Sequence, residues 1–141
     1  MAARSKARAR ALDILFEADQ RGVNVENLLS DRLLEAGTEG GSRAGNNPYT
    51  ATLVRGVVGR WSDINAALTD YSQGWTLDRM PAVDRAILRI GAWEVLWNDE
   101  IPDPVAISEA VTLATELSTD ESPGFVNGLL GRLAEVKATI V

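Results

Sequence analysis

The sequence contains no cysteine and no histidine. Without cysteine, the chain cannot form disulfides, thiolate nucleophiles, cysteine zinc sites or iron–sulfur clusters. Without histidine, it lacks the side chain that most often serves as general base and transition-metal ligand near neutral pH. No glycine-rich phosphate loop is present to organise the remaining carboxylates, lysines and hydroxyls. These absences argue against an enzyme, so we expect no catalytic residue, no metal and no cofactor.

Long apolar runs are also missing. The longest apolar stretches are far shorter than the ~20 residues that a helix needs to cross a bilayer. The basic first ten residues are not followed by an uninterrupted apolar segment, because Asp13, Glu17 and Asp19 interrupt it. We therefore expect a soluble protein with no secretory signal and no membrane partner. A chain without cysteine fits the reducing cytoplasm.

Apolar residues recur at intervals of three or four along most of the chain, whereas strand signals are nearly absent. With 141 residues, 45% of them hydrophobic, the sequence predicts a single all-α domain over residues 1–141, built as a bundle of about six to seven helices. We expect N-terminal helices within residues 1–37, a flexible glycine-rich loop at 38–47 and a helical bundle at 48–141. Within that bundle, a long helix is predicted from Pro48 to Gly74, and further helices begin near Pro81, Pro104 and Pro123.

The net charge is −6, but the ions are distributed unevenly. Residues 1–12 contain four cations and no acid. Residues 90–131 contain no lysine or arginine but eight acids, namely Glu94, Asp99, Glu100, Asp103, Glu109, Glu116, Asp120 and Glu121. This asymmetry indicates one surface for phosphate and another for a basic macromolecule, although the acidic half is equally compatible with a simple solvated face.

The four cations of residues 1–12 form a basic arm, Arg4, Lys6, Arg8 and Arg10, at the start of the first predicted helix. Cations at this end oppose the helix macrodipole, at up to ~1 kcal/mol each. They also surround the helix, which is a poor pattern for a membrane surface. Arginine-rich segments that are unstable alone can fold when RNA phosphates neutralise them, and guanidinium groups stack on unpaired bases. The arm therefore favours single-stranded RNA, and its alternative is a solubilising extension.

Three blocks stand out in the second half: residues 84–94 (DRAILRIGAWE), 101–111 (IPDPVAISEAV) and 125–130 (FVNGLL). In this order and at this spacing, they resemble the fourth, fifth and sixth helices of the NusB family. The N-terminal Arg8, Ala11, Leu15 and Phe16 match as well. The resemblance covers nearly the whole chain and fails only in the loop at 38–47.

The resemblance implies an all-helical bundle that catalyses no reaction. It implies binding to the boxA element of nascent ribosomal RNA operon transcripts, together with NusE, a protein of the small ribosomal subunit, in the transcription elongation complex. By position it assigns RNA binding to the basic arm and to Glu121 and Phe125, and NusE binding to Asp84. Each of the last three has a structural alternative: Phe125 as a core aromatic, Glu121 and Asp84 as acids at helix N-termini.

The sequence also departs from the family. Ser108 stands where the family usually has asparagine, and Gly124 where a basic residue is common, so RNA affinity is expected to be lower. Two other functions stay open, a protein-only interaction module and a stand-alone rRNA-docking domain related to rRNA cytosine methyltransferases. Trp61, Trp93 and Trp97 are compatible with either a core or a homodimer interface.

Overall fold

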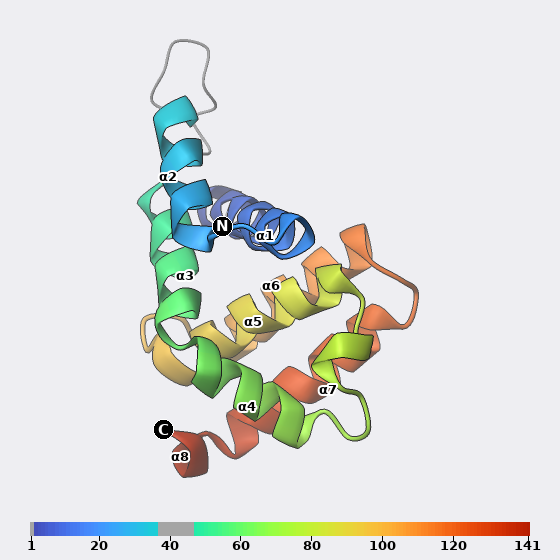
Figure 1. Cartoon of the computed structure of the whole chain (residues 1–141). Coiled ribbons are helices and arrows are strands. Elements are labelled where there is room, and N and C mark those ends of the chain that lie inside the picture. The colour runs from blue at the N-terminus through green and yellow to red at the C-terminus, as the bar shows by residue number, and fades with distance from the viewer. Residues whose placement is uncertain (1, 37–46) are drawn as a thin grey trace. The chain divides into compact units, whose positions relative to one another are not determined.

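The computed structural model describes residues 2–36 and 47–141, which contain α-helices and one 3₁₀ helix but no strand (Figure 1). The helices are α1 (Ala2–Arg21), α2 (Val25–Ala36), α3 (Pro48–Gly59), α4 (Trp61–Tyr71), the 3₁₀ helix η2 (Leu77–Arg79), α5 (Ala82–Trp97), α6 (Asp103–Leu117), α7 (Ser122–Glu135) and α8 (Lys137–Ile140). The predicted all-α fold class is confirmed. No helix in the described ranges has both the length and the apolar character needed to span a membrane.

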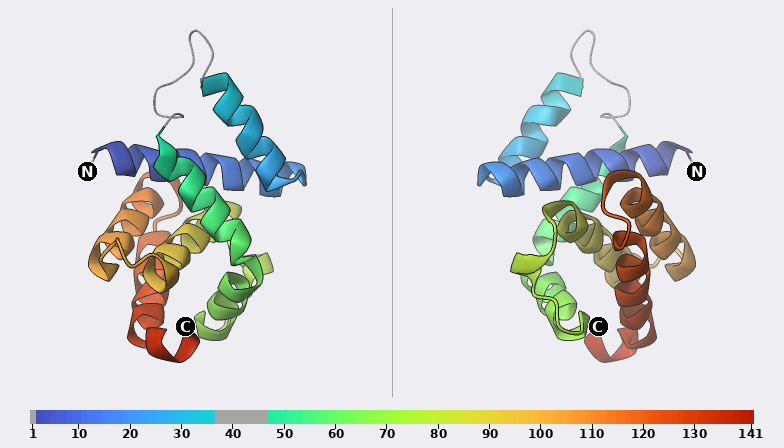
Figure 2. Two further views of the ribbon diagram at one scale, coloured as in Figure 1. Left: turned by 90° about the vertical axis from the view of Figure 1, so that its left-hand side faces the viewer. Right: turned by 90° about the vertical axis from the view of Figure 1, so that its right-hand side faces the viewer.

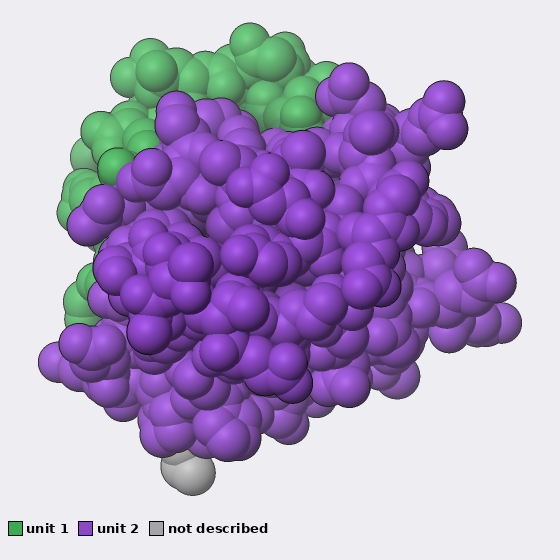
Figure 3. All heavy atoms as spheres, turned by 90° about the horizontal axis from the view of Figure 1, so that it is seen from below, with its two compact units in different colours: residues 1–59 green, residues 60–141 purple. Residues whose placement is uncertain are grey.

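The chain forms two compact units, residues 1–59 and 60–141, which Figure 3 shows in different colours. The prediction of one long helix from Pro48 to Gly74 is wrong, because α3 ends at Gly59 and α4 begins at Trp61. Arg60 between them has φ −119° and ψ 24°, outside the helical region. The apolar spacing of three and four continues across this break, so periodicity alone could not locate it. The predicted loop at 38–47 lies outside the described residues except for Asn47.

In the first unit, α1 packs against both α2 and α3. The buried apolar side chains of α1 are small or aliphatic, namely Ala7, Ala11, Leu12, Ile14, Leu15 and Ala18. Asn47 caps α3, since its Oδ1 accepts a hydrogen bond from the Tyr49 N–H at 2.9 Å. The predicted start of this helix at Pro48 is thereby confirmed.

Glu17 joins α1 to α2. Its carboxylate accepts a hydrogen bond from Arg21 Nη1 at 2.6 Å and another from Arg32 Nη2. The hydrogen bond from Arg32, followed by that from Arg21, holds the pKa of Glu17 below its ordinary value of 4.5. A carboxyl with a lower pKa in the folded chain contributes stability above its ordinary pKa and loses it as the pH falls through the folded pKa.

We therefore expect Glu17→Gln to unfold at a lower denaturant concentration than the unchanged protein at pH 7. The difference should shrink as the pH falls below 4.5, because protonation removes the charge that glutamine already lacks. Denaturant unfolding between pH 7 and pH 3 measures it. Asp13→Asn is the matched control, since burial raises the pKa of Asp13, against the opposing effect of Arg10. The stability of Asp13→Asn relative to the unchanged protein should rise with pH. An effect of Glu17→Gln that does not depend on pH would contradict the ion-pair assignment.

In the second unit, α5, α6 and α7 pack against one another, and α4 and α8 contact this group (Figures 1 and 2). The apolar stripe of α7 is fully buried, namely Val126, Leu129, Leu130 and Leu133. Gly91 of α5 lies directly against α7 and α6. A Cβ at this position would be 2.6 Å from Leu130 Cδ1 of α7 and 3.5 Å from Ala110 Cβ of α6. The missing side chain lets these helices pack closely.

Candidate nucleic-acid interface

The basic arm forms the first turns of α1. Arg4 and Lys6 are exposed and Arg10 is half-buried, whereas Arg8 is only 2% exposed. In this conformation a phosphate can reach Arg4 and Lys6 directly. It can reach Arg8 only after a change of side-chain or helix position. RNA binding by these four residues stays a prediction, and the structure distinguishes the two that already face solvent.

The arm is packed against α3. The Arg4 guanidinium carbon lies 4.8 Å from the centroid of the Tyr49 ring, and that of Arg8 lies 5.6 Å from it. The side-chain amide of Asn47 donates a hydrogen bond to the Ala3 carbonyl at 3.1 Å. In the structure the arm is helical from Ala2 onward.

Phe125 forms an aromatic pair with Trp75. Their ring centroids are 5.4 Å apart and the ring planes are inclined by 37°. Phe125 is half-buried and Trp75 is 46% exposed, and both line a hollow of about 180 Å³ on the second unit. Phe125 thus packs against another aromatic ring, as expected for the alternative interpretation of Phe125 as a core aromatic. The pair also presents aromatic surface on which an unpaired base can stack.

Trp75 was not predicted from the sequence. It follows Gln73 and Gly74, whose φ angles are +50° and +96°, and the Ser72 hydroxyl donates a hydrogen bond to its carbonyl. This turn holds the ring outside any helix. The signal that could have found Trp75 is a large aromatic residue, directly after a glycine, that belongs to none of the apolar stripes.

Glu121 also lines this hollow. It is exposed and occupies the N-cap position of α7, but its side chain makes no capping hydrogen bond. A carboxylate repels phosphate. If Glu121 contacts RNA, its carboxylate would therefore have to accept a hydrogen bond from a base or sugar. Its assignment to the RNA surface stays a prediction.

Asp84 is buried, with 3% of its surface exposed. The Ser118 hydroxyl donates to its Oδ1 at 2.5 Å, and the Ser122 hydroxyl donates to its Oδ2 at 2.8 Å. The carboxylate therefore joins the start of α5 to the connection between α6 and α7. Binding of a protein partner by Asp84 stays a prediction, although in this structure both oxygens already have donors within the chain.

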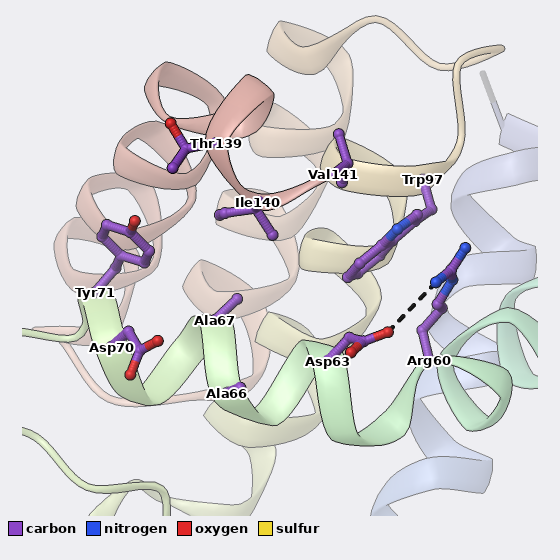
Figure 4. A pocket seen from close by; sticks show the side chains of 10 residues that line it. All are labelled: Arg60, Asp63, Ala66, Ala67, Asp70, Tyr71, Trp97, Thr139, Ile140 and Val141. Carbon is purple, nitrogen blue, oxygen red and sulfur yellow. Dashed lines mark hydrogen bonds and ion pairs between the residues drawn. The ribbon is translucent and has the colours of Figure 1, made fainter.

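A separate cleft of about 580 Å³ lies on the second unit (Figure 4). At one end Arg60 lies over the Trp97 ring, at 5.1 Å from the centroid, and forms an ion pair with Asp63 at 3.3 Å. Ala66 and Ala67 lie along its α4 side. The cleft contains none of the predicted site residues.

Within the described ranges, no three acidic side chains come together in an arrangement that could bind a metal ion. Among the described residues, the exposed cations of α1 and the aromatic pair are the candidate features for recognising RNA.

Comparison with known proteins places the chain in a family. The model of the NusB family matches residues 5–135. A relative from Kineococcus radiotolerans, named transcription antitermination protein NusB, is 57% identical over 99% of this chain and 98% of its own length. The structure of T. maritima NusB has a TM-score of 0.81 and 30% identity, over 94% of this chain and 90% of that one.

A crystal structure of the antitermination factors NusB and NusE in complex with double-stranded RNA has the same fold. Its matching chain has a TM-score of 0.81 and is 24% identical, over 96% of this chain and 98% of that one. The sequence and structural matches both extend over nearly all of this chain. The chain belongs to the NusB family.

Proposed function

We propose that this chain is an RNA-binding adaptor in transcription antitermination that catalyses no reaction. It binds boxA-type single-stranded RNA of ribosomal RNA operon transcripts together with NusE, acts in the cytoplasm and joins the transcription elongation complex. The observation that carries the proposal is the match, at 57% identity over 99% of the chain, to a relative named as an antitermination protein. The structural neighbour crystallised with NusE and double-stranded RNA supports NusE and RNA as the classes of partner, but does not bear on the choice of a single strand.

The geometry supports single-stranded RNA as the ligand. Arg4 and Lys6 are free to meet phosphates, and the Trp75–Phe125 pair provides a surface for an unpaired base. Backbone neutralisation combined with aromatic stacking is the usual means of binding single strands. Duplex RNA keeps its bases stacked and paired, which leaves the aromatic pair without a partner.

The first test is the salt dependence of RNA binding. If the basic arm neutralises about four phosphates of a single strand, log affinity should fall with log salt at a slope of roughly −3. Deleting the arm would uncover Tyr49 and Thr50 of the core, so neutralising the two exposed cations is the cleaner change. We expect Arg4→Gln with Lys6→Gln to bring the slope to about −1.5. Fluorescence anisotropy with a boxA-like RNA between 50 and 300 mM KCl measures it.

Arg55→Gln is the matched control. Arg55 is an exposed cation of the same unit, but it lies on α3 outside the arm. It should leave the slope close to that of the unchanged protein. An unaltered slope after neutralising Arg4 and Lys6 would exclude the arm as the phosphate-binding surface.

Two alternatives give different results in the same assay. A protein-only interaction module would bind NusE with no effect of the RNA or of the arm. A docking domain related to rRNA cytosine methyltransferases would bind ribosomal RNA without NusE. The family match favours the adaptor, because the Kineococcus radiotolerans relative is matched over 98% of its own length and so has no additional methyltransferase domain.

The oligomeric state is a separate part of the proposal. Trp61 is 37% exposed, although the Arg89 guanidinium carbon lies 4.2 Å from its ring centroid, and Trp93 and Trp97 are half-buried. The three residues offer limited apolar surface to a second copy. A homodimer through these residues stays a proposal, and sedimentation at the mass of a single chain would exclude it.

A further inference from the structure

The start of α3 contacts the basic arm at three places. The Asn47 side-chain amide donates to the Ala3 carbonyl at 3.1 Å, and the Thr50 hydroxyl donates to the Ala7 carbonyl at 3.2 Å. Between these two residues, Tyr49 places its ring near the guanidinium groups of Arg4 and Arg8, at 4.8 and 5.6 Å. The first two turns of α1 are therefore bound to α3 by two hydrogen bonds and one aromatic ring.

The ring offsets the arm's unfavourable charge. Arg4 lies in the first turn of α1, where a cation opposes the macrodipole, and the four cations of the arm repel one another. An aromatic ring has a negative face that attracts guanidinium groups, and the attraction increases where water is excluded. Tyr49 is only 8% exposed, so its contact with Arg8, itself 2% exposed, is largely desolvated.

We infer that Tyr49 is a positioning residue for RNA recognition, whose ring holds the first turns of α1 helical and Arg4 in place before RNA arrives. The inference rests on the proposed function, since it concerns how the same arm is presented to phosphate. Tyr49 itself need not touch the RNA. Without the ring, the arm would have to become ordered during binding, which lowers affinity without changing how many phosphates are neutralised.

Removing the ring should therefore lower RNA affinity without changing its dependence on salt. We expect Tyr49→Leu to weaken binding of a boxA-like RNA by about 5- to 30-fold, the equivalent of two cation–π contacts. The slope of log affinity against log salt should stay near that of the unchanged protein. Hydrogen exchange of the amides in residues 3–10 should become faster, while that of α5 to α7 should not change.

Two replacements of nearly the same shape test whether the effect of the Tyr49 ring depends on its electron-rich face. Tyr49→Phe keeps an electron-rich ring and should keep affinity within about twofold of the unchanged protein. Pentafluorophenylalanine at position 49 has nearly the same shape but no negative face, so it should reproduce the loss seen with Tyr49→Leu. This comparison also applies if Tyr49→Leu fails to fold. Equal affinity of the phenylalanine and pentafluorophenylalanine proteins would overturn the inference.

A double-mutant cycle shows whether Tyr49 acts through the arm. In a protein carrying Arg4→Gln and Arg8→Gln, the added change to pentafluorophenylalanine should have no effect on RNA affinity. A full effect in that background would overturn the positioning role. The two proposals fail differently: if neutralising Arg4 and Lys6 leaves RNA binding unchanged, the arm's proposed function fails, whereas if only the changes at Tyr49 have no effect, this inference alone fails.

Discussion

Asp84→Lys is expected to destabilise the second unit by about 3 kcal/mol or more. The change removes the acceptor of the Ser118 and Ser122 hydroxyls and brings an ammonium group into a site that is 3% exposed. Each buried polar group that loses its partner costs about 1–3 kcal/mol, and an unpaired buried charge costs more. Denaturant unfolding followed by tryptophan fluorescence measures the loss, since all four tryptophans lie in residues 60–141.

Asp84→Asn provides the matched comparison. Asparagine has nearly the same shape and keeps one carbonyl oxygen as an acceptor, so it should cost less than lysine. Asp120→Lys, at an exposed acid near the same connection, should change stability by less than about 0.5 kcal/mol. If Asp84→Lys were as stable as Asp120→Lys, the buried role of the carboxylate would be wrong.

The expected destabilisation by Asp84→Lys changes how a surface for a protein partner must be tested. Weakened NusE binding by Asp84→Lys would not separate a lost contact from a disturbed bundle. Glu116 and Asp120 are exposed acids, so their charge can be reversed by substitution without disturbing the core. A basic partner that binds through this acidic half should lose affinity when these residues are replaced by lysine.

Trp75→Ala is expected to lower RNA affinity by roughly 5- to 150-fold, because stacking of one base on an aromatic side chain contributes about 1–3 kcal/mol. Trp75 is 46% exposed, so its removal leaves little cavity in the core. Anisotropy with a boxA-like RNA measures affinity. The salt slope should not change, because stacking neutralises no phosphate.

Trp75→Phe is the control for the ring and should retain most of the affinity. Trp61→Ala removes a tryptophan of comparable exposure from α4 of the same unit, outside the aromatic pair, and should leave RNA binding intact. Undiminished RNA binding by Trp75→Ala would remove the aromatic pair from the proposed RNA surface.

Most of the fold could be predicted because each helix carries its own signals. Asn47 and Pro48 set the start of α3, and the buried stripe of α7 followed from apolar spacing. The break at Gly59–Arg60 could not be predicted, because both helices bury apolar faces of similar spacing. The short α8 was also missed, since its four residues contain less than two turns of periodic pattern.

The candidate site was harder to predict than the fold. Sequence position identified the basic arm but could not show that Arg4 and Lys6 are exposed while Arg8 is buried, because exposure depends on contacts between α1 and α3. Similarly, Asp84 matched an interface position by alignment to family blocks, whereas its two serine donors lie 34 and 38 residues away in the chain. Such long-range hydrogen bonds leave no local pattern in a single sequence.

The helical state of the basic arm has a kinetic consequence. A segment that must fold while it binds adds a conformational step after each encounter, and many encounters then dissociate before that step is complete. In the structure the exposed cations lie on a helix that begins at Ala2. If RNA binds as proposed, its capture would be limited by diffusion and by the attraction between opposite charges, and the lifetime of the complex would be set by stacking and phosphate contacts.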